Sequence, residues 1–278
     1  MGRHLHTFSL LLRRTLVATY RHGGLGVAKG VAYSALLAFF PLLATTVMLV
    51  VQARAEYVLN AVSAFLSQIL PPGTESLVID YLAVKGRRPV LLPVSAMLLS
   101  LLAASGAIVS LMEGFRRAYG IASGRSLVHE RVVAVLLVCT AAVLVLGASA
   151  VVVSGSRAER WIGAWVGLAP AGALGTLARD LVALAAIVLG ASILYYFGPN
   201  RRQRWRGVWP GAVVATVLWF GATSLFAWYV RNMAGYNVMY GGIAASIALL
   251  VWMYLLAVIA LVGCEFNAAR ERECEETP

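Results

Sequence analysis

The sequence predicts an all-α membrane protein: a polytopic bundle of about six transmembrane helices with an external amphipathic helical hairpin and an N-terminal interfacial helix. Of its 278 residues, 60% are hydrophobic and only 13% are charged. A soluble domain carries about 45–50% apolar and about 25% charged residues. The charges also fall in clusters between long uncharged runs, and a helix that crosses a bilayer needs roughly 20 mainly apolar residues.

Six runs without Asp, Glu, Lys or Arg are long enough to cross a bilayer. In hydrocarbon the backbone must satisfy its own hydrogen bonds, so an open chain can cross only as helices. The fourth run is short unless its helix extends back past Arg179 and Asp180 toward Gly172. The predicted spans lie near residues 30–53, 90–112, 132–154, 181–197, 208–230 and 240–264.

The distribution of Lys and Arg predicts the orientation. The side that holds both termini carries 15 of the 23 Lys and Arg residues, and the opposite side carries 8. Basic loops stay in the cytoplasm, so we expect a multi-pass membrane protein with both termini cytoplasmic. The same rule accounts for the net charge of +11 without a nucleic-acid partner. The predicted plan is a basic interfacial segment (1–29), a transmembrane domain (30–265) and a charged cytoplasmic tail (266–278).

Two stretches outside the spans are amphipathic. Residues 57–70 place apolar side chains at helical spacing and stop at Pro71-Pro72-Gly73, and residues 77–82 repeat the pattern. This favours an external hairpin that lies on the membrane or caps the bundle. A lid, a partner surface and a simple cover are all compatible with residues 54–89. The stretch Phe8–Tyr20 reads as a basic interfacial helix, or as one packed on the bundle.

Small residues recur at every fourth position in three of the predicted spans. This spacing lets membrane helices approach closely, although lipid gives them no hydrophobic reason to associate. The pattern therefore predicts how the bundle packs and says nothing about function. The three stripes are Gly30, Ser34 and Ala38; Gly106, Ser110 and Gly114; and Gly207, Gly211 and Ala215.

No enzyme or cofactor signature is present. The four histidines fall in predicted cytoplasmic segments, and none has the spacing of a metal ligand set. The sequence also lacks a nucleophile elbow, a phosphate-binding loop and a zinc-protease helix motif. We therefore expect no catalytic residue, no metal site and no cofactor.

Ionisable groups near the spans carry more information, because charge in a bilayer is costly. Glu113 precedes Arg116 and Arg117 at helical spacing, which predicts a local ion pair. Glu265 ends the last span with no basic residue before Arg270. Its carboxylate could bind a cation, relay protons, or pair with a basic loop such as 201–206.

Pro41 lies midway along the first predicted span. A proline frees a backbone carbonyl and kinks a helix. The kink would border a cavity if it is functional, or would be a packing bend if it is not.

Several segments resemble the YihY/BrkB family of bacterial inner-membrane proteins. The resemblance covers nearly the whole chain and is most specific near its end. Residues 113–120 resemble the family more loosely. Cys264 stands at a position where the family more often has a small residue. The segments that carry the resemblance are Ala32–Pro41, Tyr195–Arg202, Tyr240-Gly241-Gly242, Leu250–Leu255 and Gly263–Ala268.

The resemblance implies six spans with cytoplasmic termini, in agreement with the count above. Members of the family have been labelled as a tRNA-processing ribonuclease or linked to serum resistance or envelope lipid export. The ribonuclease label fits these residues badly. RNA cleavage needs an acid–base pair or a metal cluster in a water-accessible site, and no segment here forms a cytosolic domain to hold one.

Together these inferences favour transport or export of a lipid-like or small amphiphilic substrate without ATP, with membrane lipids as the other partners. The alternative is a non-transporting membrane scaffold or envelope assembly factor. Basic side chains of the fourth loop are candidates for contact with anionic headgroups. The candidate pathway residues are Tyr33, Pro41, Glu113, Glu265 and Asn267, and the candidate headgroup contacts are Arg201, Arg202, Arg204 and Arg206.

Overall fold

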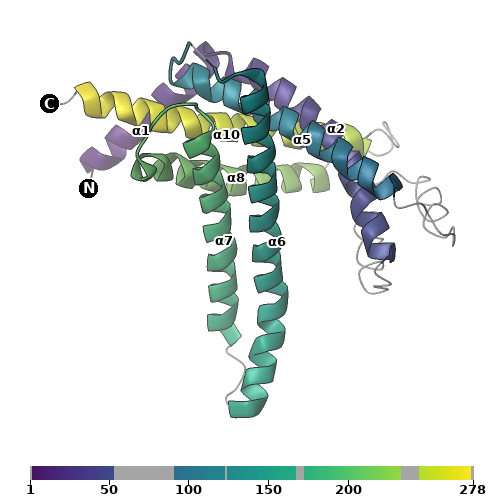
Figure 1. The fold of residues 1–278 in the computed structure, drawn as a ribbon. Helices are drawn as coiled ribbons and strands as arrows, with labels where there is room; N and C mark the ends of the chain where they lie inside the picture. The colour runs from purple at the N-terminus through teal and green to yellow at the C-terminus, as the bar shows by residue number, and fades with distance from the viewer. Residues whose placement is uncertain (1, 53–90, 123, 167–171, 233–243, 277–278) are drawn as a thin grey trace. The chain divides into compact units, whose positions relative to one another are not determined.

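The computed structural model describes residues 2–52, 91–122, 124–166, 172–232 and 244–276. Over these residues the regular structure is entirely α-helical, which confirms the predicted fold class (Figure 1). The predicted external hairpin (54–89) lies outside the described residues. The helices are α1 (Gly2–Arg21), α2 (Gly24–Gln52), α5 (Leu91–Ala118), α6 (Leu127–Val166), α7 (Gly172–Phe197), α8 (Trp205–Asn232) and α10 (Ala244–Glu276).

All of these helices except α1 contain a stretch long and apolar enough to cross a membrane, six in total among the described residues. This confirms the predicted number of spans. The helix of the fourth span begins at Gly172, past Arg179 and Asp180. In each apolar window only 11–28% of the residues are buried inside the protein. The remaining apolar surface faces outward, as spanning helices require for contact with lipid.

The chain divides into two compact units. The first unit comprises residues 1–24, 112–218 and 260–278, and the second comprises 25–111 and 219–259. Helices α5, α8 and α10 each contribute one part to each unit.

In the first unit, α6 and α7 lie side by side and run in opposite directions (Figure 1). Their surfaces meet at Gly190, where an added Cβ would lie 3.7 Å from a methyl group of Leu144, an ordinary van der Waals contact.

The tightest packing in the first unit joins α8 to α10. A Cβ added to Gly211 would collide with the backbone oxygen of Gly263. A Cβ added to Gly263 would lie 2.8 Å from the Gly211 oxygen and 2.8 Å from the Ala215 Cβ. Neither glycine can carry a side chain, which explains why the sequence has small residues at 211 and 215. Gly207, the third member of that stripe, faces open space.

In the second unit, α2 and α5 meet through two of the predicted small-residue stripes. A Cβ on Gly30 of α2 would lie 3.9 Å from the Ser110 hydroxyl of α5, which is an ordinary van der Waals contact. The buried side chains of this unit are mostly small: Val27, Ala28, Val31, Ala32, Ala38, Ala107 and Leu111.

Two glycines with positive φ end helices in the first unit. After α5, Gly120 (φ 65°) donates to the Arg117 oxygen and Ile121 to the Arg116 oxygen, the bond pair of a Schellman cap. After α1, Gly23 (φ 73°) donates to the Tyr20 oxygen. The second turn places His22 between α1 and α2.

Candidate functional site

Glu265 of α10 is a buried carboxylate with one oxygen unpartnered within the described part of the chain. Its side chain is 3% exposed, and Oε1 lies 2.5 Å from Nδ1 of His22. Oε2 is also buried and has no hydrogen-bond partner among the described residues. A buried polar atom without a partner is costly, so this oxygen marks a place where a proton or ligand would be stabilised.

His22 connects this buried carboxylate to the surface. The imidazole side chain is 35% exposed, and its backbone N–H donates to the Ala18 oxygen in the turn that ends α1. Glu265 thus pairs with the turn after α1, and not with the basic loop 201–206 that the sequence offered as a partner. Which nitrogen of the imidazole carries a proton depends on the tautomer.

Asn267 of α10 joins α10 to α8. Its Oδ1 accepts a hydrogen bond from the Gly211 N–H at 2.7 Å, and its Nδ2 donates to the Val208 oxygen at 3.0 Å. Two helical residues are separated by about 200° around the axis, so Glu265 and Asn267 face different neighbours. The sequence grouped them in one pathway, whereas the structure gives Asn267 a packing contact.

Arg201 is held by two contacts of its own unit. Its guanidinium lies 2.5 Å from the Glu271 carboxylate and 4.6 Å from the centre of the Tyr119 ring. Burial, followed by the nearby Cys264 and Glu271, raises the pKa of the Tyr119 hydroxyl far above its ordinary value, so this hydroxyl stays neutral.

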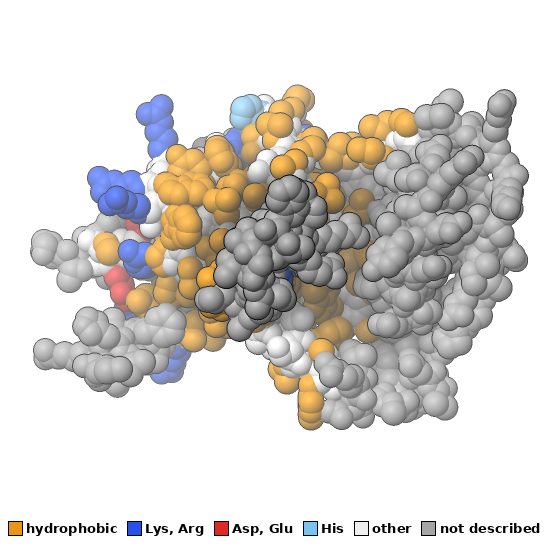
Figure 2. Space-filling view, turned by 90° about the horizontal axis from the view of Figure 1, so that it is seen from below, with side chains coloured by type: hydrophobic (Ala, Val, Ile, Leu, Met, Phe, Trp, Pro, Cys, Tyr) orange, Lys and Arg blue, Asp and Glu red, His pale blue; other side chains and the backbone are white. Residues whose placement is uncertain are grey.

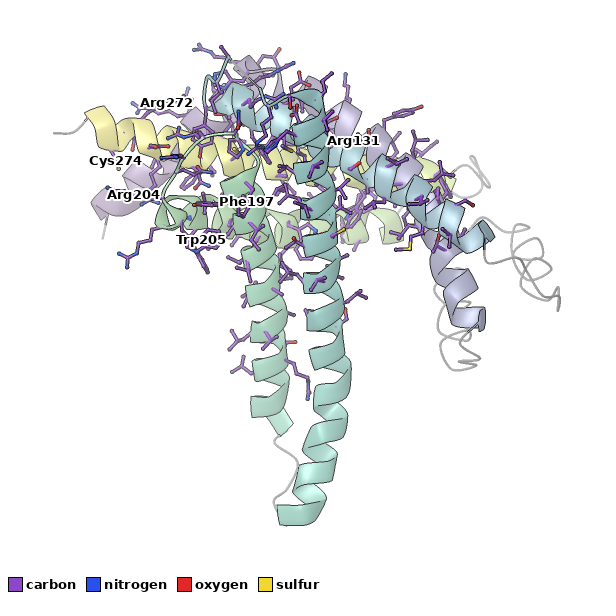
Figure 3. The ribbon with its side chains drawn as sticks, viewed as in Figure 1. Arg131, Phe197, Arg204, Trp205, Arg272 and Cys274 are labelled. Atoms are coloured by element: carbon purple, nitrogen blue, oxygen red, sulfur yellow. The ribbon has the colours of Figure 1, made fainter. Side chains whose placement is uncertain are left out.

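The other candidate headgroup contacts, Arg202, Arg204 and Arg206, are exposed. Arg204 and Trp205 lie where the α7–α8 connection enters α8 (Figure 3). Trp205 contacts two further aromatic rings edge-on, those of Tyr196 and Trp209, with centroids 5.2 and 6.4 Å away. In Figure 2, Lys and Arg side chains gather with Asp and Glu at one edge, and hydrophobic side chains cover most of the other described surface.

Polar side chains also cap the C-terminal ends of α5 and α7. Arg272 donates to the Ala118 oxygen at the end of α5. Arg125 donates to the Phe197 oxygen at 2.8 Å, and Gln203 to the Tyr196 oxygen at 3.0 Å, at the end of α7. The last carbonyls of a helix have no partner within it and carry a partial negative charge. Cationic side chains therefore stabilise these ends.

Two ion pairs of the first unit differ in burial. Glu113 pairs with Arg117 four residues later, as predicted, and both side chains are about half exposed. Arg116, which the sequence also offered to Glu113, pairs instead with Glu130 in the first turn of α6, where both side chains are largely buried.

Tyr33 and Pro41, the remaining candidate pathway residues, belong to α2 in the second unit. Tyr33 is 62% exposed. The backbone oxygen of Pro41 accepts a hydrogen bond from the Thr45 hydroxyl at 2.8 Å. Among the described residues, no group of three or more His, Cys, Asp or Glu side chains is placed to hold a metal ion.

Sequence reasoning missed the role of His22. The histidine is separated from Glu265 by 243 positions, and nothing in its local sequence indicates a buried partner. Its position before Gly23-Gly24, at the end of a predicted helix, was the available signal. Arg272 was missed for the same reason, since it caps α5, 154 positions away. Gln203 was also missed, although it caps the end of α7 only seven positions before it.

The family model described as Virulence factor BrkB matches residues 16–278 of this chain. The ribonuclease-like protein YfkH of Bacillus subtilis (strain 168) is 28% identical over 263 residues, covering 92% of this chain and 94% of YfkH. A UPF0761 membrane protein of Alteromonas mediterranea is 35% identical over 96 residues, 34% of this chain and 33% of that protein. One of Alkalilimnicola ehrlichii is 42% identical over 57 residues, covering 20% and 13%. No solved structure matches the chain.

Proposed function

The chain belongs to the Virulence factor BrkB family of membrane proteins, and on that premise we propose that it transports or exports a lipid-like or small amphiphilic substrate without ATP hydrolysis. We place it in the bacterial inner membrane with both termini cytoplasmic, since Lys and Arg concentrate on that side. We assign it no enzymatic role, because the sequence contains none of the common catalytic motifs.

The observation that carries this proposal is the buried Glu265 carboxylate in the last apolar helix. Its side chain is 3% exposed, it lies in the span Ser246–Cys274, and one of its oxygens has no partner among the described residues. Ionisable residues within membrane helices are costly, and such residues usually mark a pathway or a relay. A carboxylate kept only for packing would be expected to use both oxygens.

The exposed basic side chains support an anionic amphiphile as the substrate class. Arg202, Arg204 and Arg206 are exposed beside Trp205 and Trp209. Tryptophan is enriched at membrane interfaces, and each Lys or Arg near an anionic leaflet contributes about 1 kcal/mol of attraction. Arg201 is excluded from this set because it is engaged with Glu271.

Reconstitution into liposomes tests the proposal. Phosphatidylglycerol with a fluorescent headgroup label serves as the probe, and dithionite reports its movement between leaflets. We expect the wild-type protein to accelerate this movement at least about tenfold over protein-free liposomes, equivalent to about 1.4 kcal/mol in the barrier. The variant Glu265→Gln should lose most of that gain. Glu273→Gln is the matched control, since it neutralises a partly exposed carboxylate of the same helix, where Glu273 pairs with Arg14.

Wild-type liposomes that move the anionic probe no faster than protein-free liposomes would contradict transport of this substrate class. A scaffold function has one observation in its favour, namely the close Gly211–Gly263 packing fixed by Asn267. In that case Glu265→Gln would leave function in cells unchanged, and a protein partner would co-purify at fixed stoichiometry.

A further inference from the structure

We propose that His22 and Glu265 together bind a proton and that this proton is the coupling ion of the transport cycle. The inference rests on the proposed transport function and adds to it the identity of the coupled ion. The juxtaposition of a buried carboxylate with a partly exposed imidazole carries it.

The geometry provides a route for the proton from water to the buried carboxylate. Nδ1 of His22 lies 2.5 Å from Oε1 of Glu265, close enough for direct transfer. The His22 side chain is 35% exposed, whereas the Glu265 side chain is 3% exposed. Since an imidazole has two nitrogens, Nε2 can exchange a proton with solvent while Nδ1 passes one to the carboxylate.

The proton balance of the pair is simple. With neutral His22 and ionised Glu265, the pair carries a net charge of −1. Uptake of one proton from water makes the pair neutral, with the proton either on the imidazole as an ion pair or on the carboxyl group beside a neutral imidazole. No other co-reactant is needed, and release returns the same proton to water.

Burial disfavours the ionised form of Glu265, and the charged groups around it oppose that effect. From α10 itself, the guanidinium of Arg272 attracts the carboxylate, while its bond to the Ala118 oxygen holds it in place. Arg117, at the end of α5, lies close enough to Gly23 that a Cβ there would be 3.3 Å from its guanidinium. Tyr119 and Cys264 are further titratable neighbours among the described residues, and Tyr119 stays neutral.

The pair is also placed where a change of charge can reach a second element. His22 precedes Gly23, whose φ of 73° forms the turn between α1 and α2. The ion pair is therefore one of the contacts that hold this turn against α10. Loss or gain of the proton alters that contact, in the way that protonation of histidines biases other two-state elements.

Two measurements test the inference, and the first of them does not depend on the transport function. In infrared difference spectra of the purified full-length protein, mild acidification above the range in which exposed carboxylates protonate should produce the carbonyl band of a protonated carboxylic acid. Glu265→Gln should remove this band, and Glu273→Gln should leave it. In His22→Gln the band should appear at a higher pH, because the imidazole no longer stabilises the carboxylate.

The second measurement uses the phosphatidylglycerol probe in liposomes with and without a pH gradient. Wild-type movement should rise at least about fivefold with the gradient, and His22→Gln should lose this dependence. If Glu265→Gln does not fold, Glu265→Asp keeps the carboxyl group and should shift the band.

An acid-induced band that survives Glu265→Gln, or that does not shift in Glu265→Asp, overturns the proton site. Probe movement that depends on Glu265 but not on the gradient overturns proton coupling and leaves the transport function standing. A band that behaves as expected, without any probe movement, supports the proton site and refutes the proposed transport.

Discussion

In the first unit, buried polar side chains join helices that are far apart in the sequence, whereas the described hydroxyls of the second unit bond within single helices. Glu265 meets His22, and Asn267 spans to α8, 56 residues away. In the second unit, Thr45 donates to the Pro41 oxygen at 2.8 Å and Ser100 to the Ala96 oxygen at 2.9 Å. Hydroxyls of the first unit also bond within their own helices, as Thr216 does to the Ala212 oxygen at 2.8 Å. The difference therefore lies in the buried carboxylate and amide of the first unit, which reach other elements.

This difference follows from how membrane helices associate. Lipid gives no hydrophobic drive between helices, so close packing and interhelical hydrogen bonds must fix their register. The first unit has both, at Gly211, Gly263 and Asn267. In the second unit, the described α2–α5 contact at Gly30 is an ordinary van der Waals one. We infer that the α8–α10 contact of the first unit is fixed more firmly than the α2–α5 contact of the second.

The largest expected effect comes from a side chain at the α8–α10 contact. Gly211→Leu places carbon atoms where the Gly263 oxygen and the Asn267 amide already lie. We therefore expect the free energy of unfolding to fall by more than about 3 kcal/mol, or the protein not to fold. Gly207→Leu on the same helix, which faces open space, should fold normally. Size-exclusion chromatography and thermal unfolding in detergent measure both. If Gly211→Leu unfolds at the temperature of Gly30→Ala in the second unit, the contrast between the units fails.

A smaller loss is expected when the buried ion pair between α5 and α6 is broken. Glu130→Ala leaves the guanidinium of Arg116 buried without its partner, which should cost about 3 kcal/mol. The double variant Glu130→Leu with Arg116→Met should recover most of this loss, since it removes both charges. Chemical unfolding of the wild type, Glu130→Ala and the double variant measures these differences in stability. A double variant that is no more stable than Glu130→Ala would show that the charge of Arg116 is not the cause.

Asn267→Ala should lower the free energy of unfolding by about 1–2 kcal/mol, because it leaves the Gly211 N–H and the Val208 oxygen without their interhelical partner. Ser100→Ala is the matched change in the second unit, where only a bond within one helix is lost. We expect a loss below about 0.5 kcal/mol there. Equal losses in unfolding experiments would mean that interhelical bonds do not distinguish the two units.

The smallest effect is expected for the exposed ion pair of the first unit. Glu113→Gln should change the stability by less than about 0.5 kcal/mol, since both partners are about half exposed and four residues apart on one helix. A loss as large as that of Glu130→Ala would show that membership of the first unit, and not burial, decides the cost of an ion pair. Thermal unfolding at low and high salt measures it.

The sequence by itself determined the all-helical class, the number of spans and the local contacts. A bilayer forces each crossing segment to be long, apolar and helical, so a single stretch of sequence shows it. The extension of α7 back to Gly172 and the pair Glu113–Arg117 were predictable in the same way, because one helix fixes both. The small-residue stripes indicated close packing but not the partner helices.

Only the tertiary structure decided which polar groups meet. It assigned Glu265 to His22, Arg201 to Glu271, and Asn267 to the backbone of α8. Each of these contacts depends on how a helix is rotated and on which neighbour it faces, and a rotation by one residue (about 100°) would aim the same side chain elsewhere. Because lipid and protein both accept apolar side chains, sequence periodicity does not indicate how a membrane helix is rotated. The long-range contacts therefore appear only in the folded chain.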